Sequence, residues 1–132
     1  MAIAPILQVA AILRRMKPRR TDERDAMACP QFPRAIELIG KRWTGAIVRE
    51  FFYGAKRFSD VRDAIPGMTD RMLSERLKEL ETEGIVGRTV TPETPVRIEY
   101  SLTPKGRALL QALKALGQWA STWAEEKAPV AS

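Results

Sequence analysis

The sequence contains no histidine and a single cysteine, Cys29, among its 132 residues. The absence of histidine excludes the commonest general base, the Ser–His and Cys–His nucleophile pairs, and most zinc and iron sites. One cysteine per chain excludes an intrachain disulfide and a metal cage built from cysteines alone, and it suits a reducing compartment. We therefore expect no catalytic residues, no metal and no cofactor, and a binding protein rather than an enzyme.

The sequence also lacks the features of a membrane-inserted or secreted chain. Residues 1–13 are apolar, but thirteen helical residues rise only about 20 Å, against roughly 30 Å for a hydrocarbon core. A secretory signal begins with basic residues, whereas here the basic cluster follows the apolar stretch. We expect a cytoplasmic protein with no stable membrane insertion.

Residues 1–26 are predicted to form an N-terminal arm, and residues 27–132 to form the folded domain. Three interpretations of the arm remain open. It is a mobile or partly helical segment that packs on a partner subunit, an arm that binds a membrane surface or a DNA backbone, or an extension upstream of a natural start at Met27. The basic residues available to the second interpretation are Arg14, Arg15, Lys17, Arg19 and Arg20.

The net charge of +6 is unevenly distributed along the chain. Residues 14–25 hold six basic and three acidic groups, and residues 26–132 hold 16 basic and 13 acidic groups. The body of the protein is therefore only mildly basic, which permits nucleic-acid binding without establishing it. A hydrophobic content of 45% predicts a packed core in one domain.

Apolar spacing predicts two helices in the first part of the domain. A short helix carries apolar residues between 35 and 39 and ends at Gly40. A second helix runs from about Arg42 to Tyr53, and Gly54 ends it because glycine tolerates positive φ. A short strand is expected to follow.

Two further helices, separated by a tight turn, come next. Ser59 is a good N-cap for a helix over residues 59–65, which the Pro66–Gly67 turn breaks. Thr69 then caps a helix over residues 69–83. Winding this helix at 100° per residue places its apolar residues on one side and its polar residues on the other.

The periodicity changes after Gly84, where residues 85–91 and 97–102 are predicted to form two strands. Two strands alone are marginal in water, so this hairpin must pack on the helices. Thr103–Pro104 then opens a last helix, which continues to about Glu126.

The last helix carries more apolar surface than one core requires. Its two apolar stripes span an arc of roughly 160°, wider than docking on a single core needs. We therefore expect one stripe to pack on its own domain and the other on a second copy, as a dimerisation helix. The residues predicted for this role are Leu109, Leu113, Leu116, Trp119 and Trp123. Trp43 is predicted to lie in the core.

Together these elements predict a mainly α fold with a small β component (α+β). Helix 59–65, the turn and helix 69–83 form a helix-turn-helix, and the hairpin that follows makes it a winged helix, here with a C-terminal dimerisation helix. A helix about 10–12 Å across fits a DNA major groove of similar width. The runner-up is a winged-helix module that binds another protein without DNA. The charges of Arg71, Lys78, Arg88 and Arg97 favour nucleic acid.

Residues 29 to about 113 also resemble a known family. Its matching segments are the early Cys-Pro, LIG…W, KRFSDVR, IPGMTDRMLSERLKELE and RIEYSLTPKGR. On these motifs the chain resembles the HxlR-type (DUF24) bacterial transcriptional regulators, which are related to the MarR winged helices. It departs from the family where Gly40-Lys41-Arg42-Trp43 replaces the frequent Gly-Gly-Lys-Trp, and in its longer N-terminal arm.

The resemblance implies a homodimer that binds a roughly palindromic, double-stranded DNA operator and acts as a repressor. Helix 69–83 would read the major groove, and the wing, residues 88–97, would contact the backbone or minor groove. Arg71 would bind guanine, Lys78 a phosphate, and Asp70 or Glu75 the amino group of cytosine. The residues expected to contact DNA are Lys56, Arg57, Ser59, Thr69, Asp70, Arg71, Ser74, Glu75, Lys78, Arg88 and Arg97.

The resemblance also draws attention to Cys29. Some members of the resembled family sense electrophiles, quinones or aldehydes through a cysteine at this N-terminal position. This implies a small thiol-reactive effector that acts by alkylation, a mixed disulfide or a bridge between subunits. The alternative is an inert thiol that is retained for packing.

Overall fold

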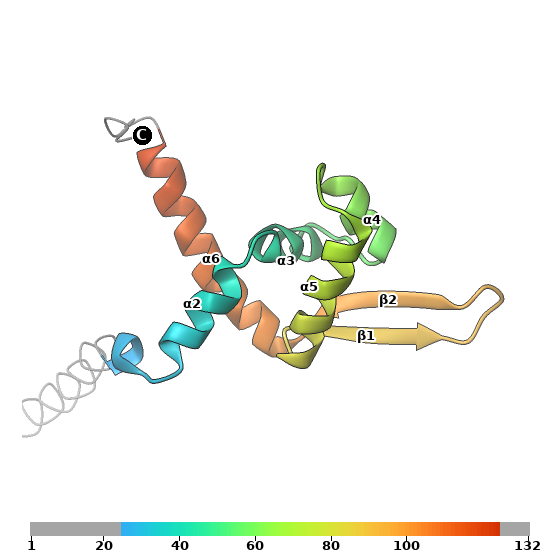
Figure 1. The fold of residues 1–132 in the computed structure, drawn as a ribbon, viewed down its shortest axis with the longest axis horizontal. Helices are drawn as coiled ribbons and strands as arrows, with labels where there is room; N and C mark the ends of the chain where they lie inside the picture. Colours follow the sequence, from blue (N-terminus) through green and yellow to red (C-terminus); the bar gives the residue numbers. More distant parts are fainter. Residues whose placement is uncertain (1–24, 125–132) are drawn as a thin grey trace, which may run out of the picture. The chain divides into compact units, whose positions relative to one another are not determined.

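The computed structural model describes residues 25–124, which fall into two compact units that divide between Gly40 and Lys41. The first unit contains a helical segment at residues 25–28 and α2 (Phe32–Gly40). The second unit contains the remaining elements (Figure 1), namely α3 (Thr44–Phe52), α4 (Phe58–Ala64), α5 (Asp70–Thr82), β1 (Val86–Thr91), β2 (Arg97–Leu102) and α6 (Pro104–Trp123). This mostly helical order with a two-stranded sheet confirms the winged helix-turn-helix prediction. Most of the predicted arm lies outside the described residues.

The core of the second unit lies where α3, α4 and α5 meet the start of the hairpin. Each helix contributes apolar residues at helical spacing, because only one face of each is turned inward. The largest fully buried side chains include Ile47, Val48, Val61, Leu73, Leu77 and Leu80. Trp43, predicted to be a core residue, is only partly buried and stands just before α3 as its N-cap.

The hairpin pairs β1 and β2 antiparallel, with Val86 opposite Leu102 at its base and Thr91 opposite Arg97 near its tip. Its base packs on the helices through Val86, which is buried, while the outer part of β1 is exposed. The strand expected between α3 and α4 is not formed. Instead a single backbone bond joins that segment to the sheet, from the Tyr100 amide to the Lys56 carbonyl at 2.7 Å.

Helix α6 begins against the end of α5. Gly84 follows α5 with a φ of +73°, as its predicted role at the helix end requires. Thr103 caps α6 by accepting a hydrogen bond from the Gly106 amide at 3.0 Å, and its hydroxyl donates to the Gly84 carbonyl. Lys105 Nζ donates to the Glu83 carbonyl at 2.7 Å. The predicted end of the helix near Glu126 lies outside the described residues.

Candidate nucleic-acid interface

The turn between α4 and α5 produces the helix-turn-helix. Gly67 adopts a φ of +86° in this turn, a conformation that costs glycine little. Thr69 follows in an extended conformation, and its hydroxyl accepts a hydrogen bond from the Met72 amide at 3.1 Å. The predicted N-cap of the reading helix is therefore confirmed. Figure 1 shows α4 and α5 side by side, with the hairpin projecting beyond them.

One face of α5 is exposed and polar, while its opposite face is buried. Leu73, Leu77 and Leu80 lie in the core. The exposed residues of the helix and its cap include the whole predicted set, Thr69, Asp70, Arg71, Ser74, Glu75 and Lys78. Because the core fixes the inward face, the structure brings these six side chains together on one surface.

Arg71 is a highly exposed charge on this face, with 89% of its side chain accessible to solvent. Its Nε lies 3.3 Å from Glu75 Oε1, one helical turn further on. Such an exposed pair contributes little to stability. This hydrogen bond uses Nε alone, so the two terminal nitrogens of the Arg71 guanidinium are outside it.

The start of α4 differs from the prediction. The helix begins at Phe58 with Arg57 as its N-cap, so the expectation that Ser59 caps it is wrong. Asp60 supplies the cap instead, because its Oδ2 accepts hydrogen bonds from the amides of Arg57 at 3.0 Å and Lys56 at 3.1 Å. Those amide bonds, that from Arg57 first, lower the pKa of Asp60 from its ordinary value of 3.8.

This cap determines where the candidate DNA-binding residues before α4 lie. The Asp60 carboxylate holds the backbone of Lys56 and Arg57 in place, and both residues are exposed. Ser59 lies in the first turn of α4 and is half-buried. The two basic residues are therefore the accessible members of this group.

An ion pair that the sequence reasoning missed joins the two helices of the motif. On α4, Arg62 Nη1 lies 3.8 Å from Oδ2 of Asp70, which is in the first turn of α5. Arg62 Nε lies 3.2 Å from Oδ1 of the neighbouring Asp63. The two partners are eight residues apart on different helices, so no periodicity could have indicated the pair. Asp70 therefore has a cationic neighbour within the protein.

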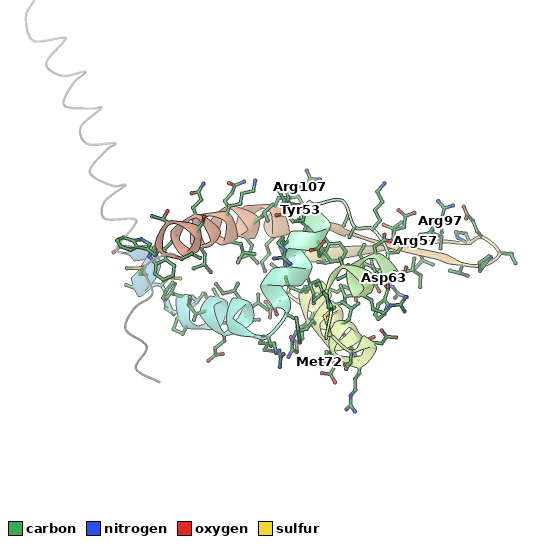
Figure 2. The ribbon with its side chains drawn as sticks, turned by 90° about the horizontal axis from the view of Figure 1, so that it is seen from above. Tyr53, Arg57, Asp63, Met72, Arg97 and Arg107 are labelled. Carbon is green, nitrogen blue, oxygen red and sulfur yellow. The ribbon has the colours of Figure 1, made fainter. Side chains whose placement is uncertain are left out.

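The two arginines predicted for the wing have different surroundings. Arg97 is paired with Glu93 at 3.2 Å and Glu99 at 3.6 Å. Arg88, which is exposed on β1 opposite Tyr100, forms no ion pair within residues 25–124. In Figure 2, Arg57 and Arg97 lie toward the hairpin, whereas Arg107 and Met72 lie on opposite sides of the second unit.

Comparison with known proteins identifies the family. The family model described as HxlR-like helix-turn-helix matches residues 38–128, more than half of the chain. The chain belongs to the HxlR-like helix-turn-helix family. The matched region contains the helix-turn-helix, the wing and all of α6.

Named members resemble this chain over most of their length. It is 53% identical over 95 residues to the uncharacterised HTH-type transcriptional regulator YvaP of Bacillus subtilis, covering 72% of this chain and 88% of that protein. It is 45% identical over 97 residues to the HTH-type transcriptional regulator YodB of the same organism, covering 74% and 87%. The recognised resemblance is thus confirmed, and the relatives are HTH-type transcriptional regulators.

Solved structures of HxlR-like proteins share the fold. The reduced form of YodB from B. subtilis superposes with a TM-score of 0.68 at 44% identity, covering 76% of this chain and 98% of that one. The reduced form of a protein described as the redox regulator HypR superposes with a TM-score of 0.65 at 37% identity, covering 68% of this chain and 89% of that one.

In this member of the HxlR-like family, Cys29 is a free and exposed thiol in the first unit. It lies three residues before α2, and its Sγ accepts a hydrogen bond from the Gln31 amide at 3.4 Å. Cys29 is therefore accessible in this structure and lies outside α2.

The predicted dimerisation residues lie along α6 of this HxlR-like chain. Leu109 and Leu113 are half-buried, whereas Leu116, Trp119 and Trp123 are more than half exposed. A groove of about 350 Å³ runs between α3 and the middle of α6, and Phe52, Tyr53 and Leu113 are among its lining residues. One strip of α6 is thus covered and the other is open.

Two further properties concern only the residues that the structure describes. None of their helices is long and apolar enough to cross a membrane. Among the same residues, no group of three or more Cys, Asp or Glu side chains is placed to hold a metal ion.

Proposed function

We propose that this chain is a sequence-specific DNA-binding transcriptional repressor that acts as a homodimer. The observation that carries the proposal is the division of α5 into a buried apolar face and an exposed face of six polar side chains. A helix presented in this way by a helix-turn-helix can enter a major groove with its first turns toward the base edges.

In this proposal, Arg71 is the main base-reading residue. A guanidinium can donate two parallel hydrogen bonds to O6 and N7 of guanine. The Glu75 partner contacts Nε at 3.3 Å, which leaves the two terminal nitrogens of the guanidinium outside this hydrogen bond. Lys78, exposed and without an ion pair among the described residues, binds a phosphate.

The wing and the start of α4 supply contacts with the DNA backbone. Arg88 contributes more than Arg97, because Glu93 and Glu99 already neutralise the Arg97 guanidinium. Lys56 and Arg57 contact phosphates from a backbone that Asp60 holds in place. Such contacts determine register and affinity but read no sequence directly.

The homodimer forms through the open strip of α6. Trp119 is 62% exposed, and Leu116 and Trp123 lie one helical turn to either side of it. Aromatic and leucine side chains presented together in this way are typical of a buried interface. A two-fold dimer would present two copies of α5 to a palindromic operator, with half-sites about one helical turn apart. Trp119→Ala should convert the dimer to a monomer in sedimentation velocity.

Cys29 makes the repressor responsive to a small thiol-reactive effector. The relatives include structures titled as diamide-treated YodB and as the redox regulator HypR, and Cys29 is exposed here. Its thiolate attacks a ring carbon of a quinone or the carbonyl carbon of an aldehyde and forms a C–S bond. A π bond of the effector breaks, and its electron pair moves to the carbonyl oxygen, which takes up the proton that the thiol lost. Alternatively, the Cys29 thiols of two chains lose two protons and two electrons to an oxidant such as diamide and form an S–S bridge. Cys29→Ser should abolish the response of DNA binding to diamide.

The decisive experiment is fluorescence anisotropy with DNA from upstream of the gene for this protein, against a scrambled competitor across a salt series. We expect binding to the correct site at least about a thousandfold tighter than to scrambled DNA. Arg71→Ala should relax specificity, whereas Arg107→Ala, which removes an exposed arginine on the side away from α5 (Figure 2), should not.

Two outcomes would overturn the proposal. Weak, strongly salt-dependent binding that is indifferent to sequence across the genome would indicate only phosphate attraction. No binding at low salt by a folded protein would favour the alternative, a winged-helix module that binds another protein.

A further inference from the structure

The segment Lys41–Trp43, here called the junction, is held against the side of the reading helix. Arg76 on α5 donates from Nε to the Arg42 carbonyl at 3.1 Å and from Nη1 to Glu79 Oε1 at 3.1 Å. Lys41 Nζ lies 3.2 Å from the other oxygen of Glu79. Two side chains of α5 thus bind both the backbone and a side chain of the junction.

The junction is conformationally unusual. Trp43 has a φ of +78°, the only non-glycine residue with positive φ among those described. Such a conformation costs about 1 kcal/mol or more and persists only where its surroundings enforce it. The Arg42 guanidinium lies 4.6 Å from the centre of the Trp43 ring. The ring also reaches the turn of the motif, because a Cβ added to Gly67 would lie 3.8 Å from it.

Arg76 and Glu79 lie outside the surface that would face DNA. At 100° per residue Arg76 falls beside the buried face of α5, away from Arg71 and Ser74, and Glu79 falls at the edge between Arg76 and Glu75. Only 18% of the Arg76 side chain is exposed. Its two hydrogen bonds use a forked geometry that a lysine cannot reproduce. The pair therefore determines where α5 lies rather than what it reads.

We propose that Arg76 and Glu79 are positioning residues that lock the reading helix to the junction. The chain enters the second unit at Lys41, directly after α2, so the lock holds α5 to the first residues of that unit. The end of α5 is held separately, by Lys105 at the start of α6. This inference rests on the proposed DNA-binding function and assigns the residues that set the angle of the reading helix.

The first test measures how DNA affinity depends on the spacing between the two operator half-sites. Arg76→Met keeps the length of the side chain and removes both hydrogen bonds. Arg49→Met removes an exposed α3 arginine whose ion pair within residues 25–124 is with its neighbour Glu50. We expect Arg76→Met to lower operator affinity about tenfold, as for loss of charged hydrogen bonds. It should also weaken the preference for the native half-site spacing over spacings changed by one base pair. Arg49→Met should do neither.

An unchanged spacing preference in Arg76→Met would overturn the proposal. So would an equal loss of affinity for every DNA accompanied by a parallel fall in the melting temperature, because that pattern indicates a purely structural role. The conservative variant Glu79→Gln should reproduce the loss of spacing preference, while Glu81→Gln, a neutralisation elsewhere on α5, should not.

A second measurement tests the lock without DNA. Hydrogen exchange of the full-length protein should become faster in residues 41–46 and 70–79 of Arg76→Met, and stay unchanged in Arg49→Met. Equal exchange in wild type and Arg76→Met would disprove the lock. If wild type binds no DNA sequence specifically, the proposed function fails, but the exchange result still decides whether Arg76 holds the junction.

Discussion

Helices α5 and α6 are both amphipathic and both begin at a threonine N-cap, but they bury their apolar residues to different extents. The three leucines of α5 that face inward are buried, whereas in α6 only Leu110 and Gly106 are. Among the described residues, α4 and β1 pack against α5, while Leu116, Trp119 and Trp123 of α6 are exposed. Amphipathicity therefore identifies a helix that packs on something. The tertiary structure is needed to show which other elements it packs against.

The largest expected difference between the two helices is in the cost of removing a leucine. Leu73→Ala on α5 should reduce the free energy of unfolding by about 3 kcal/mol, because the site is fully buried and leaves a cavity. Leu116→Ala on α6 should cost less than about 1 kcal/mol at protein concentrations where the chain is monomeric. Urea denaturation over a concentration series measures both. Equal costs in the monomer would show that α6 is covered by its own chain.

The second comparison uses two glycines within α6. A Cβ at Gly106 would lie 2.1 Å from the Ile85 carbonyl oxygen, whereas nothing lies within 4 Å of one at Gly117. Gly106→Ala should therefore destabilise the protein by about 2 kcal/mol through forced backbone displacement. Gly117→Ala should stabilise it by about 0.5 kcal/mol, because alanine is the better helix former. Thermal unfolding of both variants tests this comparison. A neutral Gly106→Ala would contradict the close contact between α6 and the backbone of Ile85.

The third comparison concerns the two threonine caps. Thr69→Ala should cost about 1 kcal/mol, the usual value for a lost N-cap. Thr103→Ala should cost more, about 2 kcal/mol, because its hydroxyl also donates to the Gly84 carbonyl and joins the end of α5 to the start of α6. Equal losses in chemical denaturation would mean that this second bond adds nothing.

The smallest expected effect on stability comes from the charged cap of α4, Asp60, which unlike the neutral Thr69 cap of α5 depends on pH. Because the folded-state pKa of Asp60 is lowered, its carboxylate stabilises the fold above its ordinary pKa, and this contribution is lost as the pH falls through the folded pKa. Asp60→Asn should lower the melting temperature slightly at neutral pH, and this difference from wild type should disappear only as the pH falls below 3.8 and through the lowered folded pKa. Asp63→Asn, on the same helix, serves as the control. A difference from wild type that persists in acid would contradict a role for the ionised carboxylate.

Most element boundaries could be predicted because their signals are local. Thr69, Thr103–Pro104 and the glycines at 54, 67 and 84 each act on neighbouring residues through backbone conformation or capping, so their roles can be inferred from sequence. Ser59 shows the limit of that inference. It and Asp60 are both capable capping residues, and the helix start depends on which of them reaches the preceding amides.

The charges of the candidate site could be named from sequence, but their partners could not. Arg71 and Glu75 are one turn apart on a helix, so their pairing follows from spacing. Arg97 was expected to be as available to DNA as Arg88, yet two glutamates on the hairpin neutralise it. Arg76 lies beside the apolar residues of α5 on the helical wheel, and no local spacing indicates that it binds the Arg42 carbonyl, 34 residues earlier.

By itself, the sequence determined the helix-turn-helix, the wing and the polar face of α5, because each depends on residue type and on spacing within a few residues. Only the tertiary structure decided which arginines are free of ion pairs among the described residues, where α4 begins, and how the junction is bound to α5. Those outcomes depend on groups that are distant in the chain and meet only after the core has packed. A hydrogen bond or ion pair between them requires distances of a few ångströms, which no local pattern specifies.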